Sequence, residues 1–251
     1  MQLSVVVPVF NEAGNLLPLL EEIHVALASH GDFEVIIVDD GSTDDGPQRL
    51  ATALAGRPRL RALRHARRAG QSAALRTGIE VARGDWVATL DGDGQNDPAD
   101  LPRLLREARE RDLSGHWLLA GWRTRRRDSG LKRLSSRLAN GLRRRLLRDA
   151  TPDTGCGLKL LPRATFLALP WFDHMHRFLP ALVLRAGGQV VSIPVSHRPR
   201  RQGRSKYGVH NRLWVGLVDL LGVFWLQRRR RRVEVTALGA DACHPVDSEA
   251  A

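Results

Sequence analysis

This sequence has few cysteines, and fewer acidic than basic side chains. Its 251 residues include two cysteines, Cys156 and Cys243, too few for a disulfide framework or a four-cysteine zinc site. This low cysteine content fits a reducing compartment. The 27 Asp and Glu are outnumbered by 39 Lys and Arg, so the formal net charge is +12. A surface this basic attracts phosphates, whether on nucleotides, nucleic acid or anionic lipid.

Long apolar runs are also missing, and the sequence pattern does not predict a secretory leader. The main apolar stretch, 213–226, contains Asp219 and is shorter than the ~20 residues of a membrane span. The first residues carry neither a basic region nor a small-residue cleavage site. We therefore expect a cytoplasmic chain that does not cross a membrane by itself. Its length and its 43% content of hydrophobic residues suit one domain with a substantial core.

Short β-branched runs alternate with helical patterns along most of the chain. The runs predict strands at 3–9, 33–38, 60–64, 86–90, 117–121 and 189–195. Apolar spacing of three or four predicts helices near 16–27, 44–55, 71–83, 98–111, 162–169, 174–186 and 208–226. This rhythm is typical of an α/β domain with a mostly parallel sheet.

Polar residues follow three of these strands, at 11–12, 39–40 and 91–93. In open parallel sheets ligands bind beyond the carboxyl ends of the strands, so we expect these residues to meet at one edge. Asp91, Asp93 and Gln95 supply hard oxygen ligands of the kind that Mg²⁺ or Mn²⁺ takes, together with substrate phosphates. An acidic turn that caps the next helix is the alternative interpretation.

Cationic segments lie downstream of the acidic edge. Residues 122–148 contain eleven Arg and Lys and one acid, with leucines spaced by three or four, which predicts an amphipathic helix with a basic face. The stretch from Arg200 to Lys206 predicts a flexible basic loop that could close over a diphosphate. A solvated charged loop is the alternative interpretation.

Four ordered motifs resemble those of family 2 glycosyltransferases, most closely the dolichol-phosphate mannosyltransferase-like branch that includes bacterial polyprenyl-phosphate glycosyltransferases. They are VVVPVFNE at 5–12, VDDGSTD at 38–44, GQSAAL at 70–75 and DGDGQNDP at 91–98. The resemblance continues through DTGCG at 153–157, HRFLP at 176–180 and RRQGRSKY at 200–207, and it covers about 1–227. One departure is Gly94, where the family often has Leu.

This resemblance implies a GT-A fold and a metal-dependent, inverting transfer of a sugar from a UDP- or GDP-linked donor to a polyprenyl phosphate of undecaprenyl or dolichyl type. It places base and ribose contacts at Pro8, Phe10, Glu12, Val38 and Asp40. It places metal and diphosphate contacts at Asp91, Gly92, Asp93 and Gln95, with Arg200 and Lys206 on the donor phosphates. It places acceptor-phosphate contacts at Arg123 and Lys132, and Asp93, Arg123 and Arg200 would be the catalytic set.

The expected organisation is a GT-A domain over 1–227 and a basic, then disordered, tail over 228–251. Within the domain, 1–121 would bind the nucleotide-sugar, 122–207 the acceptor, and 208–227 would form an interfacial helix. That helix carries Leu, Trp and Phe and is followed by five arginines at 228–232, which suits the inner face of an anionic cell membrane. A core helix with a charged end is the alternative. A membrane protein that uses the lipid-linked sugar in building the cell envelope would be a further partner.

Three other functions compete with this one. A family 2 transferase that extends a cell-surface glycan or a soluble acceptor fits less well, because the basic segment is directed at a phosphate. Nucleic-acid binding predicts basic residues interleaved with stacking aromatics, yet 123–148 contains no aromatic residue. A non-catalytic membrane adaptor would not need the metal ligands. His174, His176 and His197 are spaced too irregularly for zinc, although His176 lies in a family-like motif and could line the acceptor site.

Overall fold

The computed structural model describes residues 2–124, 141, 143–199 and 209–229, with the side chains of the last helix from 215 onward. The strands are β1 (Leu3–Val9), β2 (Phe33–Asp39), β3 (Leu60–Arg64), β4 (Trp86–Thr89), β5 (Trp117–Arg123), β6 (Lys159–Pro162) and β7 (Gln189–Val195). The α-helices are α1 (Ala13–Leu27), α2 (Gly46–Leu54), α3 (Gln71–Glu80), α4 (Leu101–Glu110), α6 (Arg163–Ala168), α7 (Leu179–Ala186) and α8 (Val209–Arg228). Two short 3₁₀ turns are η1 (Pro98–Asp100) and η2 (Met175–Arg177).

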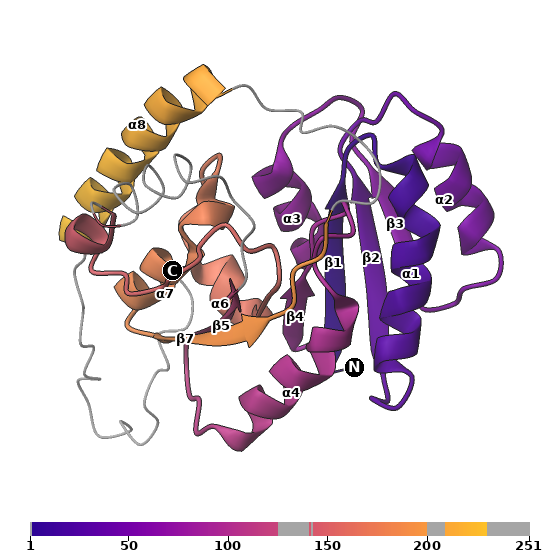
Figure 1. Ribbon diagram of the computed structural model, residues 1–251, viewed down its shortest axis with the longest axis horizontal. Coiled ribbons are helices and arrows are strands. Elements are labelled where there is room, and N and C mark those ends of the chain that lie inside the picture. Colours follow the sequence, from indigo (N-terminus) through magenta and orange to yellow (C-terminus); the bar gives the residue numbers. More distant parts are fainter. Residues whose placement is uncertain (1, 125–140, 142, 200–208, 230–251) are drawn as a thin grey trace, which may run out of the picture.

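The strands of the described residues form one seven-stranded sheet in the order β3-β2-β1-β4-β6-β5-β7 (Figure 1). Every pair of neighbours is parallel except those that β6 makes, since β6 runs antiparallel to both β4 and β5. The last residue of β1, Val9, is paired with Asp39 at the end of β2. The carboxyl ends of β1, β2 and β4 therefore lie along one edge, as expected from the sequence.

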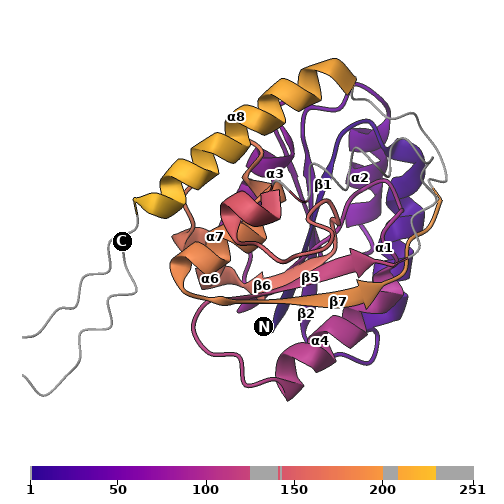
Figure 2. The same ribbon diagram turned by 60° about the vertical axis from the view of Figure 1, so that its left-hand side comes forward.

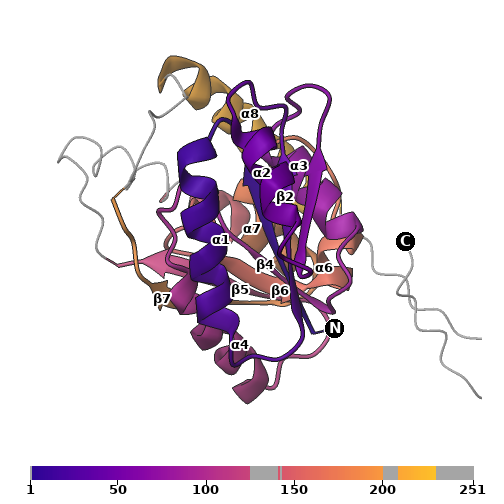
Figure 3. The ribbon, with the colours of Figure 1, turned by 90° about the vertical axis from the view of Figure 1, so that its right-hand side faces the viewer.

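Helices cover both faces of the sheet, which explains the continuous apolar runs of its strands. On one face, Val5 and Val7 of β1 pack with buried residues of α1, α2 and α4. On the other, Val6 packs with buried residues of α3, α6, α7 and α8. Figure 3 shows α1 and α3 on opposite sides of the strands. Trp117 is buried in the first of these clusters and the partly buried Trp86 packs against it, with the two rings edge to face and their centroids 5.4 Å apart.

The expected single helix over 174–186 is wrong. The chain forms η2 over Met175–Arg177 and then begins α7 at Leu179. Pro180 occupies the first turn of α7, where its missing N–H costs nothing, whereas inside a longer helix it would clash with the preceding turn. His174 adds a left-handed backbone, with φ of 64°, just before η2.

Two further differences concern β6 and the end of α3. The sequence pattern did not predict β6, a four-residue strand between a lysine and a proline. The helix expected over 71–83 ends at Glu80, where Arg163 bonds the last carbonyls, with Nε donating to Ile79 O at 2.9 Å and Nη2 to Glu80 O at 2.6 Å.

The expected amphipathic helix of 122–148 falls largely outside the described residues, although 143–147 are helical.

Helix α8 lies across the outside of α7 (Figure 2). Leu220 and Val223 are buried in the core on the sheet face that α3 and α7 cover. Leu217, Leu221 and Trp225 are exposed. The helix therefore packs with one side and leaves an apolar stripe on the other. Among the described helices none combines the length and hydropathy that a bilayer crossing requires.

Candidate active site

The loops after β1 and β2 are joined by the side chains of Asn11 and Ser42. Asn11 adopts a left-handed backbone with φ of 52°, which Asn tolerates better than most residues. Its N–H donates to Ser42 Oγ at 2.8 Å, and its Oδ1 accepts from Thr43 N at 2.7 Å. These bonds fix the two loops against each other at the carboxyl edge of the sheet.

Asp40, directly after β2, holds the loop that leads into α3. Its Oδ1 accepts from Ala69 N at 2.7 Å and lies 2.8 Å from His65 Nδ1, while its Oδ2 accepts from Gly70 N at 2.8 Å. The carboxylate is buried. Because both oxygens are already bonded to protein groups, Asp40 shapes the 65–70 loop as well as facing the edge.

The turn after β4 is held by its own side chains. Asp91 N donates to Asn96 Oδ1 at 3.1 Å, and Gln95 N donates to Asp93 Oδ1 at 3.1 Å. Gly92 packs so closely on β1 that a Cβ there would lie 2.6 Å from Val9 Cγ1. The motif therefore forms a defined turn whose two carboxylates stand beside the end of β1.

The Asp91 carboxylate sits in a tight cradle. Gln71 Nε2, at the start of α3, donates to Asp91 Oδ1 at 2.9 Å. Gly157 approaches so closely that an added Cβ would lie 2.3 Å from the carboxylate. Burial, together with the neighbouring charge of Asp93, raises the pKa of Asp91 to about 6, while Lys159 and Arg123 act in the opposite direction. The cradle therefore holds an acid whose negative charge is incompletely compensated.

Lys159, at the start of β6, brings a buried cation beneath this edge. Its ammonium donates to the carbonyl of Cys156, and burial lowers its pKa. Cys156 itself is fully buried and accepts from Asn96 Nδ2 at 3.7 Å, so it is a small core residue.

Arg123, at the end of β5, is held by a bidentate ion pair with Asp153. Its Nε donates to Asp153 Oδ2 at 2.6 Å and its Nη2 donates to Asp153 Oδ1 at 2.8 Å. The Asp153 carboxylate is buried and the guanidinium is mostly so. Such fork-to-fork pairs fix both position and orientation, so Arg123 is a preorganised cation near Asp91.

Residues 197–198 precede the basic loop and pair with residues 95–96 in the turn after β4. Arg198 N donates to Gln95 O at 3.0 Å, and Gln95 Nε2 donates to Arg198 O at 3.5 Å. The Arg198 guanidinium also bridges Asp97 and Glu22, with Nη1 to Glu22 Oε2 at 2.8 Å. The chain therefore enters the 200–206 segment from directly beside Gln95.

The structure brings most of the expected site residues to this edge. Pro8, Phe10 and Glu12 are partly buried along it, and Arg68 lies over the Phe10 ring with its guanidinium carbon 4.4 Å from the centroid. Val38 is fully buried, and its side chain packs in the core on the α3 side. Lys132, Arg200 and Lys206 lie outside the described residues.

Three site residues carry a role that sequence reasoning did not assign. Gln71 and Asp153 lie within motifs that the sequence analysis quoted, which was a signal that they belong to the site. The motifs did not predict that Gln71 bonds Asp91 or that Asp153 pairs with Arg123. Lys159 gave no signal, because it lies in the strand that the pattern missed. His176, suggested for the acceptor site, is half-buried, and its Nδ1 lies 2.7 Å from Ser72 Oγ.

The acidic turn fits a hard divalent cation that is also held by substrate. Burial, and after it the charge of Asp93, raises the pKa of Asp91, and a bound cation would offset both effects. Within the residues described, no three His, Cys, Asp or Glu side chains cluster as a metal site. Two carboxylates completed by phosphate oxygens are the usual arrangement for Mg²⁺.

Comparison with known proteins places the chain in a recognised family. The model of "Glycosyl transferase family 2" matches residues 4–168. Dodecaprenyl-phosphate galacturonate synthase of Rhizobium johnstonii is 38% identical over 238 residues, covering 92% of this chain and 69% of that protein. Undecaprenyl-phosphate 4-deoxy-4-formamido-L-arabinose transferase of Edwardsiella ictaluri is 37% identical over 209 residues, covering 82% of this chain and 63% of that protein. The chain thus spans less than two thirds of the second relative.

A solved structure shares the fold. Glucosyl-3-phosphoglycerate synthase of Mycobacterium tuberculosis, crystallised with Mn²⁺, uridine diphosphate and phosphoglyceric acid, superposes with a TM-score of 0.63 at 21% sequence identity. The match covers 94% of this chain and 81% of that one. The expected GT-A fold is therefore confirmed.

Proposed function

Because the chain belongs to glycosyl transferase family 2, we propose that it transfers a sugar from a UDP- or GDP-linked donor to a polyprenyl phosphate, with inversion at the anomeric carbon. The carrying observation is the edge where Asp91 and Asp93 stand beside Arg123, a cation fixed in place by Asp153. The names of the two relatives, which describe dodecaprenyl- and undecaprenyl-phosphate enzymes, support the class of acceptor.

The donor would occupy the edge formed by residues 1–121, with the acceptor on 122–207. We assign the base and ribose to Pro8, Phe10, Glu12, Asp40 and the backbone of Val38. We assign the divalent cation, Mg²⁺ or Mn²⁺, to Asp91, Asp93 and Gln95; when bound, it neutralises charge on the departing nucleotide diphosphate. Arg200 and Lys206 are assigned to the donor phosphates, and Arg123 and Lys132 to the acceptor phosphate.

The acceptor chemistry explains why the site needs cations more than a base. A phosphate monoester has a second pKa near 6, so its oxygen is already a nucleophile close to neutral pH. The difficulty is to bring this anion up to a negatively charged donor. Arg123 meets it by electrostatic stabilisation and positioning, because its ion pair with Asp153 fixes the guanidinium before the acceptor arrives.

The acceptor's isoprenoid tail requires work at a membrane surface. The exposed stripe of α8, Leu217, Leu221 and Trp225, together with the arginines that follow it, supports peripheral attachment to the anionic inner face of the cell membrane. We expect the protein to bind anionic vesicles at low salt and to release them as salt is raised. Vesicle binding that is absent at low salt would contradict this attachment.

The transfer is tested by incubating the full chain with a panel of nucleotide-sugars, including uronate and pentose donors, a polyprenyl phosphate, detergent and Mg²⁺ or Mn²⁺. A lipid-linked sugar from one donor, lost on chelation and in Asp93→Ala, is the expected result. Arg106→Gln, an exposed change on α4, is the control and keeps activity. If no donor gives a lipid product but a soluble glycan is extended, the acceptor assignment is wrong.

A further inference from the structure

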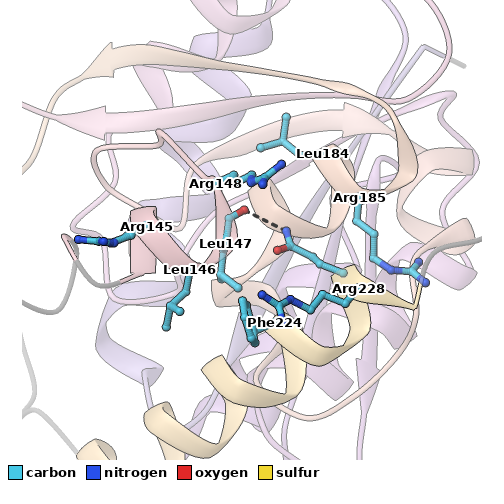
Figure 4. Close-up of a pocket in the computed structure, with 9 residues that line it drawn as sticks. Arg145, Leu146, Leu147, Arg148, Leu184, Arg185, Phe224 and Arg228 are labelled. Carbon is cyan, nitrogen blue, oxygen red and sulfur yellow. Dashed lines mark hydrogen bonds between the residues drawn. The ribbon is translucent and has the colours of Figure 1, made fainter.

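A cavity at the C-terminal end of α8 lies apart from the catalytic edge. It has a volume of about 530 Å³, within the ~300–1,000 Å³ range of small-molecule sites, and is bounded by residues of 145–148, α7 and α8 (Figure 4). The end of α7 that lines it leads directly into the start of β7. Since β7 runs parallel to β5, and β5 in the same direction as β4, the start of β7 lies at the edge opposite Asp91.

Four arginine residues line this cavity. They are Arg145, Arg148, Arg185 and Arg228. None of the four forms an ion pair with a carboxylate of the described residues: Asp149 pairs with Arg143 at 3.4 Å, and Asp219 with His174 at 3.1 Å. The cavity therefore gathers positive charge that its nearest acids do not neutralise.

The walls between the arginines are apolar and fixed. Leu147, Leu184 and Phe224 line them, and Arg228 lies over the Phe224 ring with its guanidinium carbon 4.2 Å from the centroid. Gln227 closes the wall by donating from Nε2 to Leu147 O at 3.0 Å, a bond visible in Figure 4. The packed helices thus preform both the charged and the apolar parts of the cavity.

Arg148 enters the cavity from a strained backbone. Its φ of 52° lies in the left-handed region, which few residues other than Gly, Asn and Asp adopt readily. The conformation ends the 143–147 helical turn and turns Arg148 toward Leu184, as Figure 4 shows. Strained residues of this kind are commonest at binding sites.

The apolar stripe of α8 continues to the mouth of the cavity. Leu217, Leu221, Trp225 and Arg228 follow one another at intervals of four, four and three residues, so they share one side of the helix. The three apolar members are exposed. A ligand with its anion at Arg228 can therefore lay a hydrocarbon chain along this stripe.

We infer that this cavity binds the headgroup of an anionic phospholipid, whose acyl chains lie along the exposed stripe of α8. Arginine forks match phosphate oxygens in pairs, and the apolar walls suit the glycerol and upper acyl carbons. A phospholipid bound here fixes the orientation of the protein on the membrane. The inference rests on the proposed function only in taking the protein to work at a membrane surface.

The test compares two double variants that each remove two positive charges. Arg148→Gln/Arg228→Gln changes the cavity, and Arg83→Gln/Arg106→Gln changes exposed arginines outside it. Binding is measured by flotation with vesicles of phosphatidylcholine alone or mixed with phosphatidylglycerol. We expect the cavity variant to lose at least tenfold in affinity for the mixed vesicles and the control less than twofold. Equal losses would show general charge attraction and overturn the inference.

A second measurement separates a lipid site from a phosphate site. Water-soluble short-chain phosphatidylglycerol, below its micelle concentration, is titrated into wild-type protein and the cavity variant. We expect saturable binding to wild type alone, with neither short-chain phosphatidylcholine nor inorganic phosphate competing at the same concentration. Competition by inorganic phosphate at equal strength would overturn the lipid assignment.

The inference and the proposed function fail in different ways. Sugar transfer to a water-soluble, short-chain polyprenyl phosphate should be the same in wild type and in Arg148→Gln/Arg228→Gln. A loss of that activity in the cavity variant would place the arginines in the transfer reaction and overturn the inference. A wild-type chain that binds phosphatidylglycerol in the cavity but transfers no sugar would refute the proposed function alone.

Discussion

A methyl group at Gly157 tests whether the position of Asp91 matters. In the structure an added Cβ would lie 2.3 Å from the Asp91 carboxylate, whereas ordinary contacts begin at 3.4 Å. Gly157 cannot easily retreat, because its carbonyl accepts from Thr89 Oγ1 on β4 at 2.6 Å. In Gly157→Ala the carboxylate must therefore move by about 1 Å.

Both stability and activity should respond to this displacement. Overpacking of this kind costs about 1–3 kcal/mol of unfolding free energy. A displacement of ~1 Å in a catalytic site lowers the rate by roughly 100-fold. We expect Gly157→Ala to remain folded at 25 °C, with a reduced Tm, and to show a kcat lower by about two orders of magnitude in the lipid-product assay.

Gly155→Ala is the matched control in the same loop. A Cβ at Gly155 would meet its nearest atoms, on Arg123 and Asp153, at 3.4 and 3.7 Å, which are ordinary contacts. We expect its kcat to stay within threefold of wild type. A folded Gly157→Ala with wild-type kcat would refute the role of Asp91, and equal losses in both variants would point to the loop backbone instead.

Two further changes probe the frame around the site. Asp40→Asn would turn an NH₂ donor toward the N–H group of either Ala69 or Gly70, because these groups donate to different oxygens of Asp40. We expect a loss on the order of 2 kcal/mol in unfolding free energy, measured by urea titration, and an unchanged midpoint would contradict the hydrogen-bond assignment. Burial lowers the pKa of His176 well below 6.5 in the folded chain. Below pH 6.5 the unfolded chain therefore binds a proton that the folded chain does not, and the free energy of unfolding falls as pH drops from 7 to 5. His176→Gln should flatten this pH dependence by up to ~1.4 kcal/mol per pH unit, and an unchanged slope would assign it to another group.

The acidic edge was predictable because it depends on local patterns. β1, β2 and β4 are buried on both faces and so read as continuous apolar runs, and parallel strands bring their polar ends together. Asp91 and Asp93 follow directly from that rule. The family resemblance then supplied the chemistry that composition alone left open between nucleotide, lipid and nucleic acid.

The second half of the sheet was less predictable, because charged residues there are buried by distant partners. β6 begins at Lys159, and nothing in a four-residue segment indicates that its buried ammonium acts on the Asp91 carboxylate. Arg123 appeared to be one member of a basic run, yet Asp153, thirty residues away, sets its orientation. The break between η2 and α7 depends on Pro180, a signal that the apolar spacing outweighed.

The balance of charge at the edge explains where the rest of the basic residues are needed. The Asp91 carboxylate faces one buried ammonium, that of Lys159, while the nearby Arg123 is already paired with Asp153. Burial first, and the charge of Asp93 second, disfavour the ionised form of Asp91 and raise its pKa to about 6. A donor diphosphate and an acceptor phosphate would add more negative charge to the same edge. Under the proposed function, the divalent cation, Lys132 and the basic loop at 200–206 supply the positive charge that these phosphates need. A chain that keeps the fold but loses the cation or the loop should bind donor poorly and transfer nothing.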